Sequence, residues 1–155
     1  MARPRTAARL AAVQALYQIE QAGLPAAAVI AEFRSHRLAP AGDYEEGGAP
    51  EADAGFFARL VEATIARQEA SDAAIAPVLP REWPLARLDP VLRALLRAAA
   101  GELADPAGPP ARVVINEYLD VAHGFFAGEE PRLANGALDA LARRLRPAEF
   151  ADLPG

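Results

Sequence analysis

The chain of 155 residues contains no cysteine and no lysine. The absence of cysteine excludes a disulfide scaffold, a cysteine nucleophile and any thiolate-ligated zinc or iron–sulfur site. Only two histidines are present, His36 and His123, so few ligands remain for a transition metal, and we expect neither a metal nor another cofactor. No uncharged apolar run approaches the roughly 18 residues that a membrane-spanning helix requires. We therefore expect a cytoplasmic protein with no membrane partner.

The sequence also lacks the common catalytic and nucleotide-binding motifs, namely GxxxxGK[ST], GxGxxG, HExxH and GxSxG. Ser35 and Ser71 are its only serines, and neither has a motif partner. His123 could be a general base by residue type. The simpler interpretation is a histidine at a helix C-terminus, where the helix dipole favours a cation. We predict that the protein is not an enzyme, with no catalytic residues and no small-molecule substrate.

Apolar residues make up 52% of the chain and charged residues 24%, which is close to the average of globular proteins. The length suits a single domain over 1–155. Apolar residues recur at helical spacing, with no convincing two-residue alternation. The sequence therefore predicts an all-α fold, a compact bundle of about seven helices. Two segments are expected outside the bundle, a flexible acidic loop at about 39–53 and a short C-terminal tail at 147–155.

Capping residues and prolines predict where the helices begin and end. The expected helices are, in chain order, Thr6–Ala22, Ala26–His36, one capped by Asp53, one from Ser71 or Asp72 to Leu79, one after Asp89-Pro90, and two separated by Gly128 and Pro131. The sixth helix carries apolar residues around most of its circumference, which predicts a central place in the core. Asn135 lies within an apolar stripe and is expected to be a buried hydrogen-bonding residue.

The net charge is −5, yet the first 19 residues hold Arg3, Arg5 and Arg9 and no acid. The arginine side chain donates two parallel hydrogen bonds to adjacent phosphate oxygens. A helix N-terminus beside it adds exposed N–H donors and a positive dipole end. These three residues, which we call the arginine arm, are a candidate phosphate-binding site; the alternative is a solvated basic tail.

A second candidate feature is Phe125-Phe126, between Gly124 and Gly128, in the expected turn before the last helix. An aromatic ring at such a turn can stack on an unpaired base. The alternative is that a ring closes the core beneath the turn, which we expect of one of the two rings.

Four groups of residues follow one another along the chain in a specific order and spacing. They are Val13-Gln14-Ala15-Leu16-Tyr17, Leu95-Leu96-Arg97 with Glu102-Leu103, Val114-Ile115-Asn116-Glu117, and Ala134-Asn135-Gly136 with Leu138-Asp139. Together they resemble the bacterial transcription antitermination factors of the NusB family. The similarity runs from about Arg5 to Arg146, with the acidic loop as the main unmatched stretch.

The resemblance implies two packed helical subdomains and an RNA-binding transcription antitermination factor. Proteins of this family bind the single-stranded boxA element of nascent ribosomal RNA transcripts together with the small-subunit ribosomal protein NusE. With NusA and NusG they help RNA polymerase read through terminators. By position, the resemblance implies RNA contacts at Arg5, Arg9, Phe125, Glu129 and Leu133, with Arg3 in the same arm. It implies partner contacts at Tyr17 and Leu92.

The sequence departs from the family pattern at several of these places. Thr6, Ala7 and Ala8 stand where arm positions are often basic, so fewer phosphates can be contacted. Leu133 stands where an aromatic residue is common. Two other interpretations stay open at this point: the RNA-binding domain of a ribosomal RNA cytosine methyltransferase, and a helical protein-interaction adaptor that has lost RNA binding.

Overall fold

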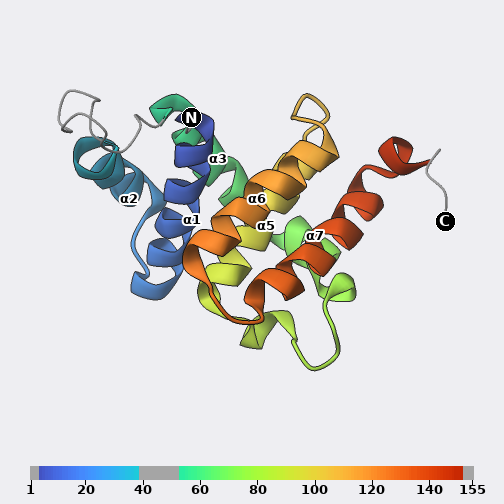
Figure 1. The fold of residues 1–155 in the computed structure, drawn as a ribbon. Helices are drawn as coiled ribbons and strands as arrows, with labels where there is room; N and C mark the ends of the chain where they lie inside the picture. Colours follow the sequence, from blue (N-terminus) through green and yellow to red (C-terminus); the bar gives the residue numbers. More distant parts are fainter. Residues whose placement is uncertain (1–3, 39–52, 152–155) are drawn as a thin grey trace. The chain divides into compact units, whose positions relative to one another are not determined.

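The computed structural model describes residues 4–38 and 53–151, and the regular elements within these ranges are all helical (Figure 1). The seven α-helices described are α1 (Pro4–Ala22), α2 (Ala26–Glu32), α3 (Ala54–Ala66), α4 (Gln68–Ile75), α5 (Pro90–Ala104), α6 (Ala111–Phe125) and α7 (Glu130–Leu145). Shorter helical segments are the π-helix η1 (Phe33–Arg37) and the 3-10 helices η3 (Ala76–Val78), η4 (Leu85–Arg87) and η5 (Pro147–Phe150). The predicted all-α fold is confirmed.

The chain divides into two compact units, Met1–Ala63 and Thr64–Gly155, and the division falls within α3. In the first unit, alanines and Val13 give α1 a closely packed buried face. Phe33 of η1 stacks on Phe57 of α3, with ring centroids 5.5 Å apart and ring planes 18° from parallel. Both rings are fully buried, so this aromatic pair ties η1 to α3 in the core of the first unit.

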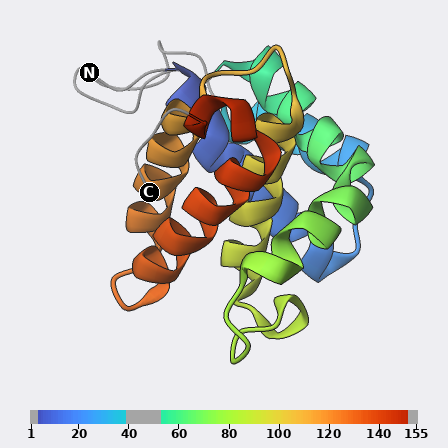
Figure 2. The ribbon, with the colours of Figure 1, turned by 90° about the vertical axis from the view of Figure 1, so that its right-hand side faces the viewer.

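In the second unit, α5, α6 and α7 pack against one another, and α4 packs against α5. Leucines fill the space between these helices, and the largest of the fully buried side chains there is Tyr118 of α6. Figure 2 shows the segment between α4 and α5 at the same end of this unit as the turn between α6 and α7. None of the helices in the described parts of the chain is long and apolar enough to cross a membrane.

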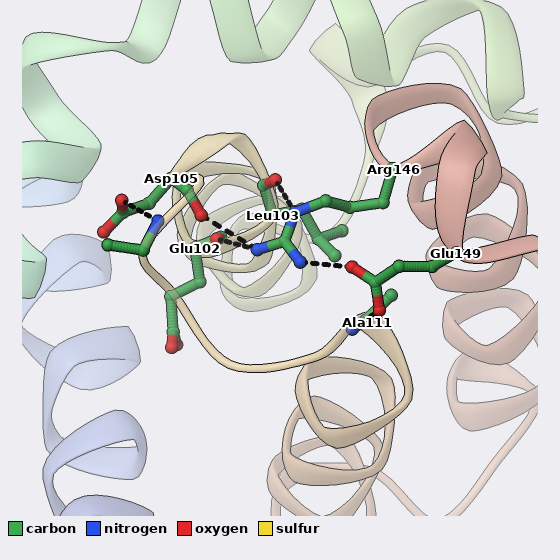
Figure 3. A network of polar contacts seen from close by, with 7 residues as sticks. Glu102, Leu103, Asp105, Ala111, Arg146 and Glu149 are labelled. Carbon is green, nitrogen blue, oxygen red and sulfur yellow. Dashed lines mark hydrogen bonds and ion pairs between the residues drawn. The ribbon is translucent and has the colours of Figure 1, made fainter.

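The end of α5 and the start of α6 are joined by polar contacts from the segment that follows α7 (Figure 3). The Arg146 guanidinium donates to the carbonyl oxygens of Leu103 (2.6 Å), Asp105 (2.9 Å) and Glu102 (3.3 Å). It also donates to Oε2 of Glu149 (2.5 Å), whose Oε1 accepts from the backbone N–H of Ala111 (2.9 Å). We call Arg146 and Glu149 the Arg146 clip: it satisfies carbonyls at one helix end and an N–H at the next helix start.

The clip depends on Gly108 and changes the acidity of Glu149. A Cβ atom at Gly108 would lie 2.9 Å from the carbonyl oxygen of Glu102 and 3.1 Å from that of Asp105, too close for a side chain. The hydrogen bond from the Ala111 N–H, and then the hydrogen bond and charge of Arg146, lower the pKa of the Glu149 carboxyl. Part of the expected C-terminal tail, 147–150, is thus a 3-10 helix anchored to the second unit.

Two predicted helix starts are confirmed in atomic detail. Oδ1 of Asp53 accepts from the N–H of Phe56 (2.9 Å) at the start of α3. Oδ1 of Asp89 accepts from the N–H groups of Val91 (2.8 Å) and Leu92 (3.3 Å) at the start of α5. Asp and Asn are favoured at such positions because their side chains satisfy N–H groups that have no partner within the helix.

Three other expectations are wrong. The fourth helix begins at Gln68, and Ser71 lies buried within it, because the chain turns at Arg67 and not at a capping side chain. Helix α6 buries one face and leaves Val113 40% exposed, so its apolar circumference does not place it at the centre of the core. Asn135 is exposed on α7, because Ala134, Ala137 and Leu138 form the buried face of the helix and Asn135 lies outside that face. Of the acidic loop, 39–52 lies outside the described residues.

Candidate nucleic-acid interface

In the first unit, Pro4 and Arg5 at the start of α1 contact Asp53, directly before α3. The backbone N–H of Asp53 donates to the carbonyl oxygen of Pro4 at 3.0 Å. Nε of Arg5 lies 3.8 Å from Oδ2 of Asp53, and the two side chains are 57% and 36% exposed. At this distance the contact is an ion pair and not a hydrogen bond. The Arg5 guanidinium is thus located by α3 while it stays open to solvent.

The ring of Phe56, in the first turn of α3, is contacted by two arginines. The guanidinium carbon of Arg5 lies 4.8 Å from the ring centroid, and that of Arg9 lies 5.0 Å from it. Cations within about 6 Å of an aromatic face are attracted by the electrons of the ring. Phe56 therefore restricts where both guanidinium groups can go. Sequence reasoning missed this residue, because the ring's role depends on how α3 meets α1.

The two described arginines of the arm differ in exposure. Arg5 is exposed, whereas Arg9 is only 3% exposed. A phosphate in solution can reach Arg5 directly, but it can reach Arg9 in this conformation only if neighbouring groups move. Arg3 lies outside the described residues. The assignment of the arm to RNA stays a prediction, and within it Arg5 is the described residue best placed to act.

In the second unit, Phe125 is the last residue of α6 and Phe126 caps it. Their ring centroids lie 6.3 Å apart, and both residues are half-buried. The expectation that one ring closes the core is wrong, since neither is fully buried. Glu129 is exposed at the N-cap position of α7, and Leu133 lies half-buried one turn further on. Both aromatic rings thus keep some surface that a base could stack on.

A cavity of about 640 Å³ lies beside this turn, within the second unit. Its lining residues come from the segment before α5, the first turn of α5, the turn before α7 and the first two turns of α7: Val78, Pro80, Trp83, Leu88, Asp89, Leu92, Gly128, Glu129, Glu130, Arg132, Leu133, Gly136 and Ala137. The cavity brings together Glu129 and Leu133, predicted to contact RNA, with Leu92, predicted to contact a protein partner. Trp83, the chain's single tryptophan, is 45% exposed at this cavity. Trp83 was not singled out from the sequence. The available signal was that it is the single tryptophan and lies in a short segment between Pro80 and Pro84.

The two predicted partner-binding residues have opposite exposures. Tyr17 of α1 is 39% exposed, as a residue that meets another protein should be. Leu92 of α5 is 1% exposed, so it presents little surface of its own. Leu92 is one of the residues that line the cavity described above. Both assignments stay predictions.

These observations define a class: an all-helical protein with an exposed arginine at the start of its first helix and an aromatic turn beside a cavity. The chain belongs to the NusB family, whose sequence profile matches residues 6–143. It is 60% identical over 152 residues to the transcription antitermination protein NusB of Granulibacter bethesdensis, covering 96% of this chain and 93% of that protein. It is 52% identical to the protein of the same name from Gluconobacter oxydans, covering 92% and 88%.

Solved structures agree with this assignment. T. maritima NusB superposes with a TM-score of 0.75 at 25% identity, covering 97% of this chain and 99% of that one. A chain in a crystal structure of the antitermination factors NusB and NusE in complex with double-stranded RNA gives a TM-score of 0.75 at 21% identity, covering 93% of this chain and 99% of that one. At that identity the second likeness establishes a shared fold.

Proposed function

We propose that this protein is a non-enzymatic, cytoplasmic transcription antitermination factor that binds a boxA-type RNA together with the ribosomal protein NusE. The observation that carries the proposal is its 60% identity, over nearly the full length of both chains, to a transcription antitermination protein. In this role it joins NusA and NusG in helping RNA polymerase read through terminators. The chain matches two transcription antitermination proteins along most of their length. The alternative of a methyltransferase domain is therefore not favoured.

The described residues support RNA binding in two places. Arg5 offers an exposed guanidinium beside the N-terminus of α1, where phosphate is favoured by both charge and helix dipole. Phe125 offers a half-buried ring at the end of α6 for stacking. Few cations are involved, so the RNA affinity of the protein alone should be low and should rise with the partner present.

The test is fluorescence anisotropy with a short boxA-like RNA, a scrambled RNA and an RNA duplex. Each is titrated with this protein at several salt concentrations, with and without the ribosomal protein. We expect preferential binding of the boxA-like strand, strengthened by the partner. About three phosphate contacts would give a plot of log affinity against log salt concentration a slope of about −2. Equal weak binding of all three RNAs would overturn the proposal.

Variants assign the binding to the proposed residues. Arg5→Ala should weaken RNA binding and make the salt slope shallower by about 0.7, the loss of one phosphate contact on a single strand. Arg144→Ala is the matched control, because Arg144 is exposed on the last turn of α7, outside the proposed interface. Tyr17→Ala should weaken binding of the ribosomal protein. Partner binding without RNA binding, even in the three-component mixture, would favour the adaptor alternative.

A further inference from the structure

The two carboxylate oxygens of Asp53 have different partners. Oδ1 accepts from the N–H of Phe56 at 2.9 Å and caps α3. Oδ2 lies 3.8 Å from Nε of Arg5. The cap needs only an acceptor oxygen, which an amide side chain also supplies, whereas attraction to Arg5 needs the negative charge. One side chain thus performs two tasks that a change of a single functional group can separate.

The contact between Asp53 and Arg5 is weak enough for another anion to displace it. Both side chains are more than a third exposed, and the separation exceeds a hydrogen-bond distance. A phosphate can offer Arg5 two parallel, charge-assisted hydrogen bonds, which are shorter and stronger than this ion pair. The ring of Phe56, 4.8 Å from the Arg5 guanidinium carbon, keeps that group beside the start of α3 whichever anion it faces.

We propose that Asp53 sets the RNA affinity of this protein by competing with RNA phosphate for the guanidinium of Arg5. Phe56 is the positioning residue that holds the guanidinium within reach of both anions. The inference rests on the proposed RNA-binding function. In the free protein Arg5 pairs with Asp53, and in the complex it turns to a phosphate and leaves the Asp53 carboxylate beside a second negative charge. Both effects make Asp53 oppose RNA binding.

Asp53→Asn tests the competition without removing the helix cap. Asparagine caps helices as well as aspartate does, so the thermal midpoint of unfolding should change little. Exposed ion pairs have small energies, so the RNA dissociation constant should fall by about two- to fivefold. Glu62→Gln is the matched control: it removes one negative charge from an exposed position on the same helix.

A double-mutant cycle assigns the effect to Arg5. The gain from Asp53→Asn should disappear in the Arg5→Ala background, because no guanidinium is left to release. An equal gain in both backgrounds, or a gain as large from Glu62→Gln, would overturn the proposal in favour of general charge repulsion. No gain from Asp53→Asn in a protein that binds RNA would overturn it as well. If neither the wild-type protein nor any of the variants binds RNA, the proposed function itself is overturned.

Two readouts examine the contact more directly. In the free protein, the NMR resonance of the Arg5 Nε–H should shift on Asp53→Asn and stay in place on Glu62→Gln. An unmoved Arg5 resonance would overturn the pairing whatever the RNA does. For the positioning role, Phe56→Leu should weaken RNA binding and Phe56→Tyr should restore it, because tyrosine keeps the aromatic face. Equal binding by the leucine and tyrosine variants would remove Phe56 from the proposal.

Discussion

The hydroxyl of Tyr118 on α6 donates a hydrogen bond of 2.5 Å to Oε2 of Glu102 on α5, and both residues are buried. The bond joins two of the three helices that form the core of the second unit. Within a core of leucine and alanine, it gives two polar groups a defined partner. A buried polar pair of this kind fixes one alignment of the two helices and disfavours others.

We predict that Tyr118→Phe lowers the free energy of unfolding by about 1–3 kcal/mol, since it removes one hydrogen bond of the buried Glu102 and fills nearly the same volume. Urea denaturation followed by circular dichroism measures the change. Tyr17→Phe is the control, because Tyr17 is exposed. Equal effects of the two substitutions would contradict a special role for the buried pair.

The Arg146 clip should contribute more than a surface ion pair. We expect Arg146→Ala to lower the free energy of unfolding by about 2–3 kcal/mol, because it leaves several carbonyls at the end of α5 without a charged donor. Arg144→Ala, nearby but exposed, should change it by less than about 0.5 kcal/mol. Arg146→Lys should recover only part of the loss, since an ammonium group lacks the planar fork of donors. Full recovery by lysine would show that charge alone matters.

The lowered pKa of Glu149 predicts a pH dependence. The native protein binds this proton less readily than the unfolded chain does, so the contribution of Glu149 is complete above the ordinary carboxyl pKa of 4.5. It is lost as the pH falls through the lower native value. The difference in unfolding free energy between wild type and Glu149→Gln should therefore be largest near neutral pH and shrink in acid. A difference that is constant, or that grows in acid, would contradict the assignment.

The two rings at the end of α6 allow a paired test of stacking. If Phe125 stacks on a base, Phe125→Ala should weaken binding of the boxA-like RNA by about tenfold, within the usual range for one aromatic–base contact. Phe126→Ala is the comparison, since Phe126 has similar burial and follows directly in the chain. Anisotropy titrations of both variants decide the assignment. A larger loss from Phe126→Ala would transfer the stacking role to that residue.

Local signals in the sequence predicted the helices well. Asp53 and Asp89 were identified as caps because capping depends on residues within one turn of each other. The start of the fourth helix was misplaced because Arg67 ends one helix and begins the next without a capping side chain. The burial of α6 was overestimated because apolar composition does not show which neighbours a helix has.

The candidate site was less predictable for the same reason. Arg5 and Arg9 look alike in the sequence, and both guanidinium groups lie against Phe56 of another helix, yet in the folded protein Arg5 is exposed and Arg9 is buried. The cavity beside Leu133 likewise needs residues from segments about 40 positions apart. Contacts between distant segments depend on the packed fold, which helical periodicity alone does not specify.

The Arg146 clip has a consequence for the order of folding. Arg146 meets carbonyls that lie 41 to 44 residues earlier in the chain, so its bonds can form only after α7 has docked against α5. Interactions that form after the transition state slow unfolding and leave the folding rate nearly unchanged. The clip should therefore act as a late latch, and its loss should shorten the lifetime of the native state while the chain still reaches that state at its normal speed.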